Sequence, residues 1–467
     1  MKIKVSNLGV ISEGTIDLSK KINLFCGPNG TGKTYLTYVI YGLLRNKLRL
    51  GDNNELADRL FANRSITIDI DFDSILEYKK SLLDLTKKTL PETFGIGEDE
   101  SGKLFSGFKI KDNETKPKFK SRIISSEINV DLNIFGLGLS LTKNKDEDKV
   151  TLSIINENIS EETIKISRFF IDSVIKLILA LHPITKVVMF PIERNSINTF
   201  SKQLSIRKQN ALDNLIKEKD ILDDLIKEKD IKKIQSLLDF KRYPVAISDE
   251  LMVADDLAEI KKRKSKFYNF AEELERELLF GEVNISSDGE ILFTPNNSPS
   301  TMLPIQMTAS IIKTLSSLVV YLKYRAKEND LIIIDEPEIN LHPKNQIILT
   351  RFFARLANKG FRLLISTHSD YIVRELNNLL ILSRKDSPSI MKNAKEFGYK
   401  DNEFINQEDL GVYSFKFNDS NDGKVSIEQI PVNETGFNID AMDLVIDKQN
   451  DISERLYYSV KYGKKSK

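Results

Sequence analysis

A glycine-rich loop near the N-terminus constrains this chain more than any other feature. Its eight residues match the pattern G-x-x-x-x-G-K-[ST] in full: Gly27, Pro28, Asn29, Gly30, Thr31, Gly32, Lys33 and Thr34. The apolar run before the loop predicts a buried strand ending at Cys26, and apolar residues at helical spacing predict a helix over 35–48. In such a unit, backbone N–H groups turn inward toward phosphate oxygens at the helix N-terminus. We therefore expect Lys33 to reach nucleotide phosphates and Thr34 to hold Mg²⁺.

Composition excludes several other classes of protein. The 467 residues are 40% hydrophobic and 29% charged, which indicates a globular chain with enough apolar material for a core. The net charge of +1 excludes a polybasic coat for nucleic acid and leaves room only for a local basic face. A single cysteine, Cys26, excludes an internal disulfide and a multi-cysteine zinc site. No apolar run approaches the roughly 20 residues that span a bilayer, so we expect a cytoplasmic protein without a membrane partner.

A second apolar run ends in carboxylates. Residues 331–338 read LIIIDEPE, which predicts a buried strand followed by two adjacent acidic side chains. We expect Asp335 to complete the Mg²⁺ shell and Glu336 to orient or deprotonate an attacking water. Glu338 could belong to the same site, or could equally be a solvated or capping residue.

A third apolar run, over 363–369, reads LLISTHS and places His368 after another strand. The carboxyl ends of parallel strands meet at one edge of a sheet, where ligands bind. We therefore expect His368 to contact the γ-phosphate or the attacking water. His342, just before the next helix, either lines the same region or caps that helix. His182 is expected to be structural.

At these residues the chain resembles the ABC-type P-loop ATPases of the SMC/RecF/OLD group. The resemblance rests on GPNGTGKT after an N-terminal strand pair, on IIIDEPEINLHP, on ISTHSDYIV and on a large insertion between the two halves of the nucleotide site. It implies an α/β fold: a P-loop NTPase core like that of ABC ATPases, with an N-terminal antiparallel β-subdomain and an inserted helical subdomain. It also implies ATP and Mg²⁺ as ligands, hydrolysis of ATP to ADP and phosphate, and ATP held between two head-to-tail copies.

The chain departs from this group at two positions. The usual Ser-Gly-Gly of the signature motif is absent, and the equivalent segment reads MTASI over 307–311. There Ser310, at a predicted helix N-terminus, is expected to face a γ-phosphate held by the partner copy. A Q-loop glutamine is not obvious. Arg194, which follows the apolar run 187–190, either serves near the nucleotide or forms an ordinary salt bridge.

Two functional hypotheses follow from the resemblance. No Glu plus Asp-x-Asp cluster of the OLD nucleases appears after His368, so the chain resembles an OLD-like ATPase without its nuclease. The first hypothesis is an ATP-binding and ATP-hydrolysing regulatory or scaffold subunit. It would dimerise or assemble on ATP and control a separate protein effector in bacterial anti-phage defence. The alternative is a RecF- or SMC-like ATPase that binds DNA in repair or maintenance. The near-neutral charge weakens this alternative, and its clearest basic run, 261–264, is better explained as a solvated helix face.

The sequence divides into four segments. These are the N-terminal half of the ATPase domain (1–194), a helical insertion (195–282), the C-terminal half of the ATPase domain (283–384) and a mixed α/β extension (385–467). Residues 65–156 look mostly strand-like, and 249–279 look like one long helix. The near-identical copies LDNLIKEKDI (212–221) and LDDLIKEKDI (222–231) indicate an exposed helical arm, with partner docking as the weaker reading. Strand and helix alternate over 331–378, which predicts a parallel sheet covered on both faces.

Overall fold

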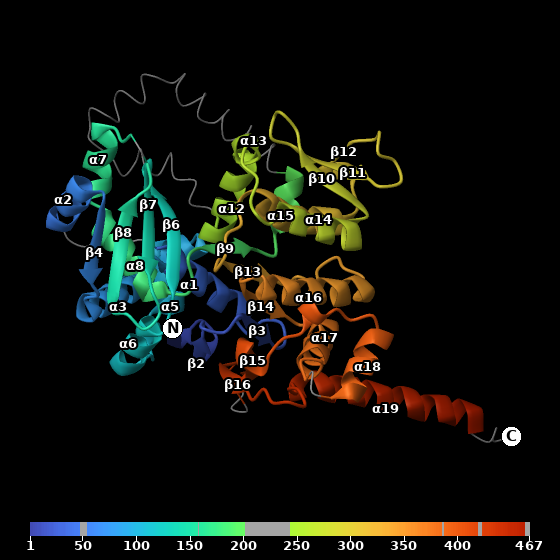
Figure 1. Cartoon of the computed structure of the whole chain (residues 1–467). Helices are drawn as coiled ribbons and strands as arrows, with labels where there is room; N and C mark the ends of the chain where they lie inside the picture. Colours follow the sequence, from blue (N-terminus) through green and yellow to red (C-terminus); the bar gives the residue numbers. More distant parts are fainter. Residues whose placement is uncertain (47–53, 157, 201–242, 385–386, 419–422, 463–467) are drawn as a thin grey trace, which may run out of the picture.

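A nine-stranded mixed sheet lies at the centre of the molecule (Figure 1). The computed structural model describes residues 1–46, 54–156, 158–200, 243–384, 387–418 and 423–462. The strands follow the order β5 (Lys109–Asp112), β1 (Lys2–Leu8), β2 (Ile11–Asp17), β16 (Val425–Ile430), β15 (Leu410–Phe417), β3 (Ile22–Cys26), β14 (Arg362–Thr367), β13 (Leu331–Asp335) and β9 (Val187–Phe190).

The five strands from β15 to β9 are parallel, as the alternation of strands and helices predicts. Their register places Cys26 opposite Thr367, and Asp335 opposite Ser366. The phosphate-loop strand, the carboxylate strand and the histidine strand therefore end at one edge of the sheet. This confirms that the three motifs lie together.

Helices cover both faces of this sheet, and alternate residues of each strand feed two separate hydrophobic cores. Ile333 belongs to the core shared with α1 (Lys33–Arg45) and the N-terminal subdomain. Its neighbours Ile332 and Ile334 belong to the core on the other face. That face is covered by α15 (Ser310–Tyr324), α16 (Pro343–Asn358) and α17 (Asp370–Ile381). The continuous apolar runs of these strands are explained by burial on both sides.

The N-terminal subdomain contains the predicted antiparallel sheet, with strand order β4 (Ser65–Asp69), β8 (Lys149–Ile154), β7 (Leu137–Lys143) and β6 (Ile128–Ile134). The prediction that 65–156 is mostly strand was wrong, because helices separate these strands. The helices of this half are α2 (Asn54–Asn63), α3 (Phe72–Lys88), α4 (Leu90–Phe94), α5 (Glu98–Phe105), α6 (Lys116–Ile124), α7 (Glu161–Arg168) and α8 (Ile171–Leu181). The alternating pattern that begins at Ile66 stops at Asp69, and the Asp71 side chain then caps α3 by accepting from the Ser74 N–H at 3.1 Å.

The described part of the insertion consists of short helices, so the prediction of one helix over 249–279 was wrong. They are α12 (Val245–Asp255), α13 (Leu257–Ile260), α14 (Tyr268–Leu274) and a π-helical turn (Glu275–Leu279). The break between α13 and α14 is fixed by Ser265, whose N–H donates to the Lys323 carbonyl at 2.8 Å and whose hydroxyl donates to the Leu322 carbonyl. The tandem repeat lies outside the described residues. After these helices, β10 (Gly281–Ile285) and β11 (Ile291–Pro295) form an antiparallel hairpin, beside β12 (Leu303–Pro304).

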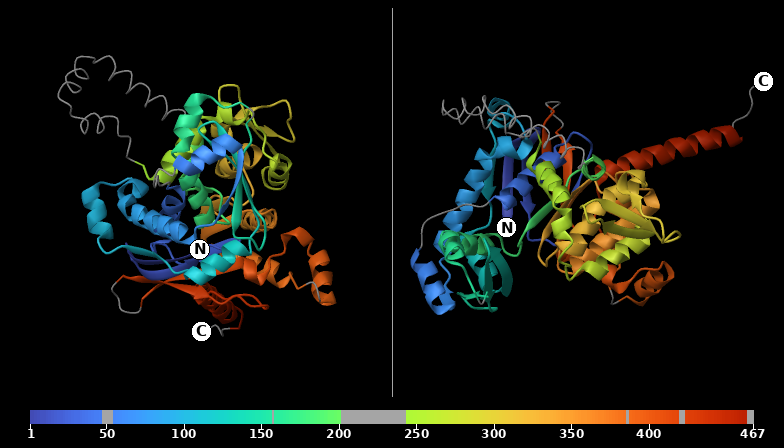
Figure 2. Two further views of the ribbon diagram at one scale, coloured as in Figure 1. Left: turned by 60° about the vertical axis from the view of Figure 1, so that its left-hand side comes forward. Right: turned by 90° about the horizontal axis from the view of Figure 1, so that it is seen from above.

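The C-terminal segment contributes to the central sheet. Its strands β15 and β16 pair as an antiparallel hairpin, and β15 pairs directly with the phosphate-loop strand β3. This part of the predicted extension 385–467 is thus built into the ATPase core. After α18 (Pro388–Glu396) and the hairpin, the chain ends in α19 (Asp440–Tyr462), which projects away from the body (Figures 1 and 2). Of the helices that the structure describes, none combines the length and apolarity that a bilayer crossing demands.

Candidate functional site

The phosphate loop joins β3 to α1 in a conformation that requires glycine. Gly30 and Gly32 have φ angles of 76° and 86°, in the left-handed region that side chains disfavour. Gly27 has φ 150°, and a Cβ there would lie 2.5 Å from the carbonyl oxygen of Phe415 on β15. The Thr31 hydroxyl donates to the Pro28 carbonyl at 2.8 Å and closes the turn. The loop conformation is thus held partly by a strand near the C-terminus.

Lys33 curls back over this loop. Its Nζ donates to the carbonyls of Gly27 at 2.8 Å and Pro28 at 2.9 Å. Burial lowers the pKa of Lys33, and the carboxylates of Glu336 and Asp335 oppose that shift. The ammonium therefore sits above the loop with only weak neutral acceptors, where phosphate oxygens would be stronger partners.

Asp335 joins the carboxylate strand to the phosphate loop. Its Oδ2 accepts from the Thr34 hydroxyl at 2.8 Å, and its Oδ1 accepts from the Ser366 hydroxyl. The structure thus brings together the two residues that the sequence predicts as metal ligands. A hydroxyl and a carboxylate are hard oxygen donors of the kind that Mg²⁺ takes. In the described part of the chain no group of three His, Cys, Asp or Glu residues could hold a metal.

Glu336 and His368 also come together at this edge. Glu336 adopts φ 46°, a strained conformation for a residue with a side chain, and its N–H donates to the Ser366 carbonyl at 2.9 Å. This geometry leaves its Oε1 3.3 Å from His368 Nδ1. Burial raises the pKa of Glu336, while the charge of His368 opposes the shift.

Glu338, whose place the sequence left open, is a buried part of the same site. Its Oε1 accepts from the Thr367 hydroxyl at 2.7 Å and from the His368 N–H at 2.8 Å. The same oxygen lies 3.5 Å from His368 Nδ1, and Glu338 Oε2 has no hydrogen-bond partner among the residues that the structure describes. The imidazole thus faces two carboxylates through one ring nitrogen. The sequence signal for Glu338 was its position two residues after Glu336, which alone does not distinguish a buried acceptor from a solvated one.

Arg194 stabilises the end of the carboxylate strand through hydrogen bonds to its backbone. One of its terminal nitrogens, Nη1, donates to the carbonyls of Asp335 at 2.7 Å and Pro191 at 2.9 Å, and Nη2 donates to the Glu336 carbonyl at 2.7 Å. Burial lowers the pKa of Arg194 to about 10. The described hydrogen bonds of Arg194 are made to backbone carbonyls at the site and not to a carboxylate, so they do not form an ordinary salt bridge, and a role near the nucleotide stays a prediction.

The remaining candidate residues lie apart from this cluster. Ser310 is the exposed first residue of α15, and none of the described hydrogen bonds joins its hydroxyl to the phosphate loop. His342 caps α16, because its Nδ1 accepts from the Lys344 N–H at 3.3 Å. His182 is buried at the end of α8, where burial lowers its pKa to about 4. Cys26 is a buried strand residue.

The basic run 261–264 lies in a turn after α13 and not on a helix face. Lys261 Nζ donates to the Ser286 carbonyl at 2.6 Å, and Lys262 pairs with Glu259 at 2.6 Å. Lys264 Nζ lies 4.0 Å from the centre of the Tyr268 ring. Three of the four cations are thus engaged within the chain.

The sequence matches the AAA ATPase domain family over residues 1–373. The chain belongs to this family. Together with the sheet topology, this confirms an α/β P-loop ATPase of the ABC type. No curated protein matches the sequence.

Three similar solved structures are heads of SMC proteins. The first, from Pyrococcus furiosus, has an extended coiled coil and is bound to the C-terminal domain of ScpA; it is 13% identical over 98% of each chain, with a TM-score of 0.34. The second is an SMC head bound to the C-winged helix domain of ScpA, 10% identical over 93% of this chain and 98% of that chain, with a TM-score of 0.36. The third, from Thermotoga maritima, is 10% identical over 92% of this chain and 98% of that chain, with a TM-score of 0.32. At these scores the likenesses carry no functional argument.

Proposed function

We propose that the chain binds ATP with Mg²⁺ and hydrolyses it at the edge of the sheet formed by β3, β13 and β14. The observation that carries this proposal is the 2.8 Å hydrogen bond between Thr34 and Asp335, which joins the phosphate loop to the carboxylate strand. The loop N–H groups and Lys33 would hold the phosphates, and Thr34 and Asp335 would hold Mg²⁺. Mg²⁺ supplies neutralisation of the charge on the phosphate oxygens.

The residues around the imidazole take separate parts in this proposal. Glu336 orients the attacking water and accepts its proton. His368 uses the ring nitrogen that does not face the carboxylates to contact the γ-phosphate or the attacking water. Glu338 positions His368, because it binds the backbone N–H of that residue and the hydroxyl of Thr367. This network supports catalysis by fixing the groups before the reaction.

A second copy of the chain would complete the site. Ser310 begins the long helix α15, its side chain is exposed, and a helix N-terminus attracts phosphate. These features support a contact with ATP held by another copy. We propose that ATP therefore drives dimerisation or higher assembly of the chain.

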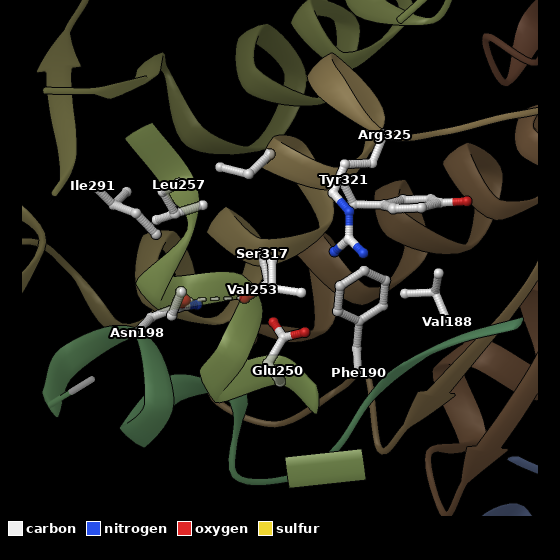
Figure 3. Close-up of a pocket in the computed structure, with 12 residues that line it drawn as sticks. Val188, Phe190, Asn198, Glu250, Val253, Leu257, Ile291, Ser317, Tyr321 and Arg325 are labelled. Carbon is white, nitrogen blue, oxygen red and sulfur yellow. Dashed lines mark hydrogen bonds between the residues drawn. The ribbon is translucent and has the colours of Figure 1, made fainter. Parts of the chain in front are cut away.

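We propose that the insertion senses this assembly. Asp249 on α12 accepts from the Tyr41 hydroxyl at 2.6 Å and from Arg45 at 2.5 and 2.9 Å, which ties α12 to the helix after the phosphate loop. The next residue, Glu250, points into a pocket shared with Phe190 on β9 and Ser317 on α15 (Figure 3). Asp249 thus contacts α1, and Glu250 approaches α15. In the proposed dimer, α1 of one copy and α15 of the other copy would face the same ATP.

Glu250 is a buried carboxyl group in this otherwise largely apolar pocket. Burial raises the pKa of Glu250, while the nearby hydroxyl of Ser317 and the charge of Arg325 oppose the shift. A buried carboxyl group is sensitive to the spacing of the elements around it, since its partners must stay close. A shift of α15 relative to α12 would therefore change the distances between Glu250 and its partners.

On this basis we propose a regulatory or scaffold subunit that acts in the cytoplasm and controls a separate effector protein in bacterial anti-phage defence. The coupling through α12 supports the regulatory part, and the resemblance to OLD-like ATPases suggests the defence setting. DNA binding receives less support, because three cations of the clearest basic run are engaged within the chain.

The test is a trap for the ATP-bound state. Tagged Glu336→Gln would be purified from its host with ATP and Mg²⁺, and the matched control would be Glu336→Gln combined with Lys33→Ala. We expect a stoichiometric protein that co-purifies with the first variant and not with the second. Nucleic acid alone would replace the effector proposal with the DNA-binding alternative. No partner at all would contradict the regulatory role, while a direct phosphate-release assay tests the ATPase activity separately.

A further inference from the structure

The tip of the phosphate loop carries an asparagine that is followed by a glycine. Asn29 is the only asparagine of the chain with this neighbour. Both Asn29 and Gly30 are exposed, whereas Gly27 and Thr31 on either side of the tip are buried. The hydrogen bond from the Thr31 hydroxyl to the Pro28 carbonyl fixes the turn at its base. The Asn29–Gly30 pair therefore lies at the solvent-exposed tip of a fixed turn.

Neither polar group of this pair is held by the rest of the chain. Among the described residues, no hydrogen bond involves the side-chain amide of Asn29 or the N–H of Gly30. Gly30 has φ 76°, and a Cβ there would have no atom within 4 Å outside the adjacent residues. Asn198 shows the contrast, because it is buried, its amide donates to the Lys313 carbonyl and it accepts from the Ser317 hydroxyl. The Asn29 amide and the Gly30 nitrogen are thus not restrained from approaching each other.

We propose that Asn29 is a site of spontaneous deamidation, the reaction that makes asparagine thermolabile. The Gly30 nitrogen attacks Cγ of Asn29, and the new C–N bond closes a cyclic succinimide. The side-chain nitrogen leaves as ammonia and takes the proton of the Gly30 N–H. Water then adds to either ring carbonyl and breaks its bond to nitrogen, which gives aspartate or isoaspartate. Water is the only other reactant, and glycine at position 30 leaves the backbone free to adopt the conformation of the ring.

Either product would damage the phosphate site. Both products add a carboxylate to the loop that is proposed to hold phosphates, and like charges repel. Isoaspartate also inserts a CH₂ group into the main chain between residue 29 and Gly30, which displaces the N–H groups that follow. This consequence rests on the proposed function, whereas the chemical step does not. A chain whose loop stays unoccupied would therefore lose its ability to bind ATP as it ages.

Asn29 should be protected while the loop is occupied. In phosphate loops the backbone N–H groups donate to phosphate oxygens. A Gly30 nitrogen that donates in this way keeps its proton and its position, so it does not attack Asn29. The chemical state of Asn29 would thus distinguish copies that have kept ATP bound from copies that have not.

The first measurement is peptide mass spectrometry of the full chain after incubation without nucleotide. At successive times the chain is digested in acid, which stops the reaction because the Gly30 nitrogen stays protonated. The matched control within the same chain is Asn63, which is exposed, donates to the Arg59 carbonyl at 2.9 Å and precedes an arginine. We expect Asn29 to react at least about tenfold faster than Asn63, a difference of about 1.4 kcal/mol in the barrier. Equal rates, or an unchanged Asn29, would overturn the proposal.

The second measurement links the modification to binding. Affinity for a fluorescent ATP analogue is followed over the same incubation, and wild type should lose affinity in proportion to the acid found at residue 29. Asn29→Gln would have to close a larger ring, so it should keep its own starting affinity throughout. Asn29→Asp should bind the analogue at least about tenfold more weakly than Asn29→Gln from the start. If wild type and Asn29→Gln lost affinity at the same rate, deamidation would not be the cause and the inactivating role would be overturned.

The third measurement tests the protection by ATP. It uses Glu336→Gln, so that ATP is not consumed, with ATP and Mg²⁺ at about ten times the measured Kd. The loop is then about 90% occupied, and deamidation of Asn29 should slow about tenfold. Combined with Lys33→Ala, the same addition should leave the rate unchanged. ATP that binds in the titration without slowing the reaction would overturn the protection. ATP that does not bind would contradict the proposed function instead, and the incubation without nucleotide would still decide whether Asn29 deamidates.

Discussion

Two parts of the molecule are each proposed to meet a γ-phosphate, one in its own site and one in the site of a second copy, and they are built in opposite ways. At the carboxyl ends of β13 and β14, Asp335, Glu336 and Glu338 are all held by contacts inside the chain. At the start of α15, Ser310 is exposed, and no described hydrogen bond holds its hydroxyl. The carboxylate edge is assembled within the monomer, whereas Ser310 would find its partner only on a second copy.

This difference has an energetic consequence. Groups that are fixed before the reaction contribute through electrostatic preorganisation, and removing one costs about 10²–10³ in rate. A group that reaches the site only across an interface contributes in proportion to how much dimer is present. Substitutions at the first part should therefore have large effects at any protein concentration, and those at the second part small effects that depend on concentration.

The largest effect is expected for Lys33→Ala. This change removes the only positive side chain that the structure places over the loop carbonyls, among the described residues. We expect kcat/KM for ATP to fall by at least about 10²–10³-fold, together with nucleotide affinity. Titration with a fluorescent nucleotide analogue and a phosphate-release assay would measure both quantities. Lys344→Ala, at an exposed lysine beside the same edge, is the control and should change neither. Retained binding in Lys33→Ala would show that the loop does not hold phosphate.

Glu336→Gln should separate binding from hydrolysis. The amide preserves the size of the side chain and removes the proton acceptor, so kcat should fall about 10²–10³-fold. The affinity for ATP should change by less than about threefold, because Lys33, Thr34 and Asp335 are untouched. Single-turnover hydrolysis and equilibrium binding on the same preparation check this. If both quantities fell together, Glu336 would be a binding residue and not a catalytic one.

The sequence predicted the site to the extent that its residues follow strands. Strand, loop and helix around Lys33, and the strands before Asp335 and His368, have strong apolar patterns, and parallel strands bring their ends together by topology. These positions were therefore predictable from local sequence.

What the sequence could not predict depended on contacts between distant segments. Glu338 looks like a loop residue until Thr367 and His368 approach it. The tight fit at Gly27 depends on Phe415, and β15 pairs with β3 although the whole central part of the chain separates them. The short helices of the insertion also depended on a tertiary contact, because Ser265 is held by backbone carbonyls of α15.

Glu338→Gln should have an intermediate effect on kcat, because Glu338 acts by positioning His368. The amide keeps an oxygen that can accept from Thr367 and His368 but loses the negative charge beside the imidazole. We expect kcat to fall about tenfold, or about 1.4 kcal/mol, with little change in KM. In a double-mutant cycle, the same change in a His368→Ala background should cost much less. Additive losses would mean that Glu338 acts independently of His368.

A second readout for Glu338 does not depend on activity. The chain has three histidines, so ¹⁵N-labelled imidazoles can be assigned with single substitutions at His182 and His342. Loss of the Glu338 charge should shift the His368 ring signals and leave the other two unchanged. A merely structural role for Glu338 would not produce such a selective change.

The smallest effect is expected for Ser310→Ala, and it tests the comparison most directly. If Ser310 contacts ATP across an interface, its loss should lower kcat about two- to fivefold, close to the value of one hydrogen bond. The loss should appear only at protein concentrations where ATP brings copies together.

Mixing two variants then decides whether Ser310 acts within its own copy or between copies. In a dimer of Ser310→Ala with Lys33→Ala, one site combines an intact loop with an intact serine from the other copy. An excess of inactive Lys33→Ala should therefore restore the rate of Ser310→Ala. Without such rescue, Ser310 acts within its own chain or not at all, and the two parts of the molecule would not belong to one shared site.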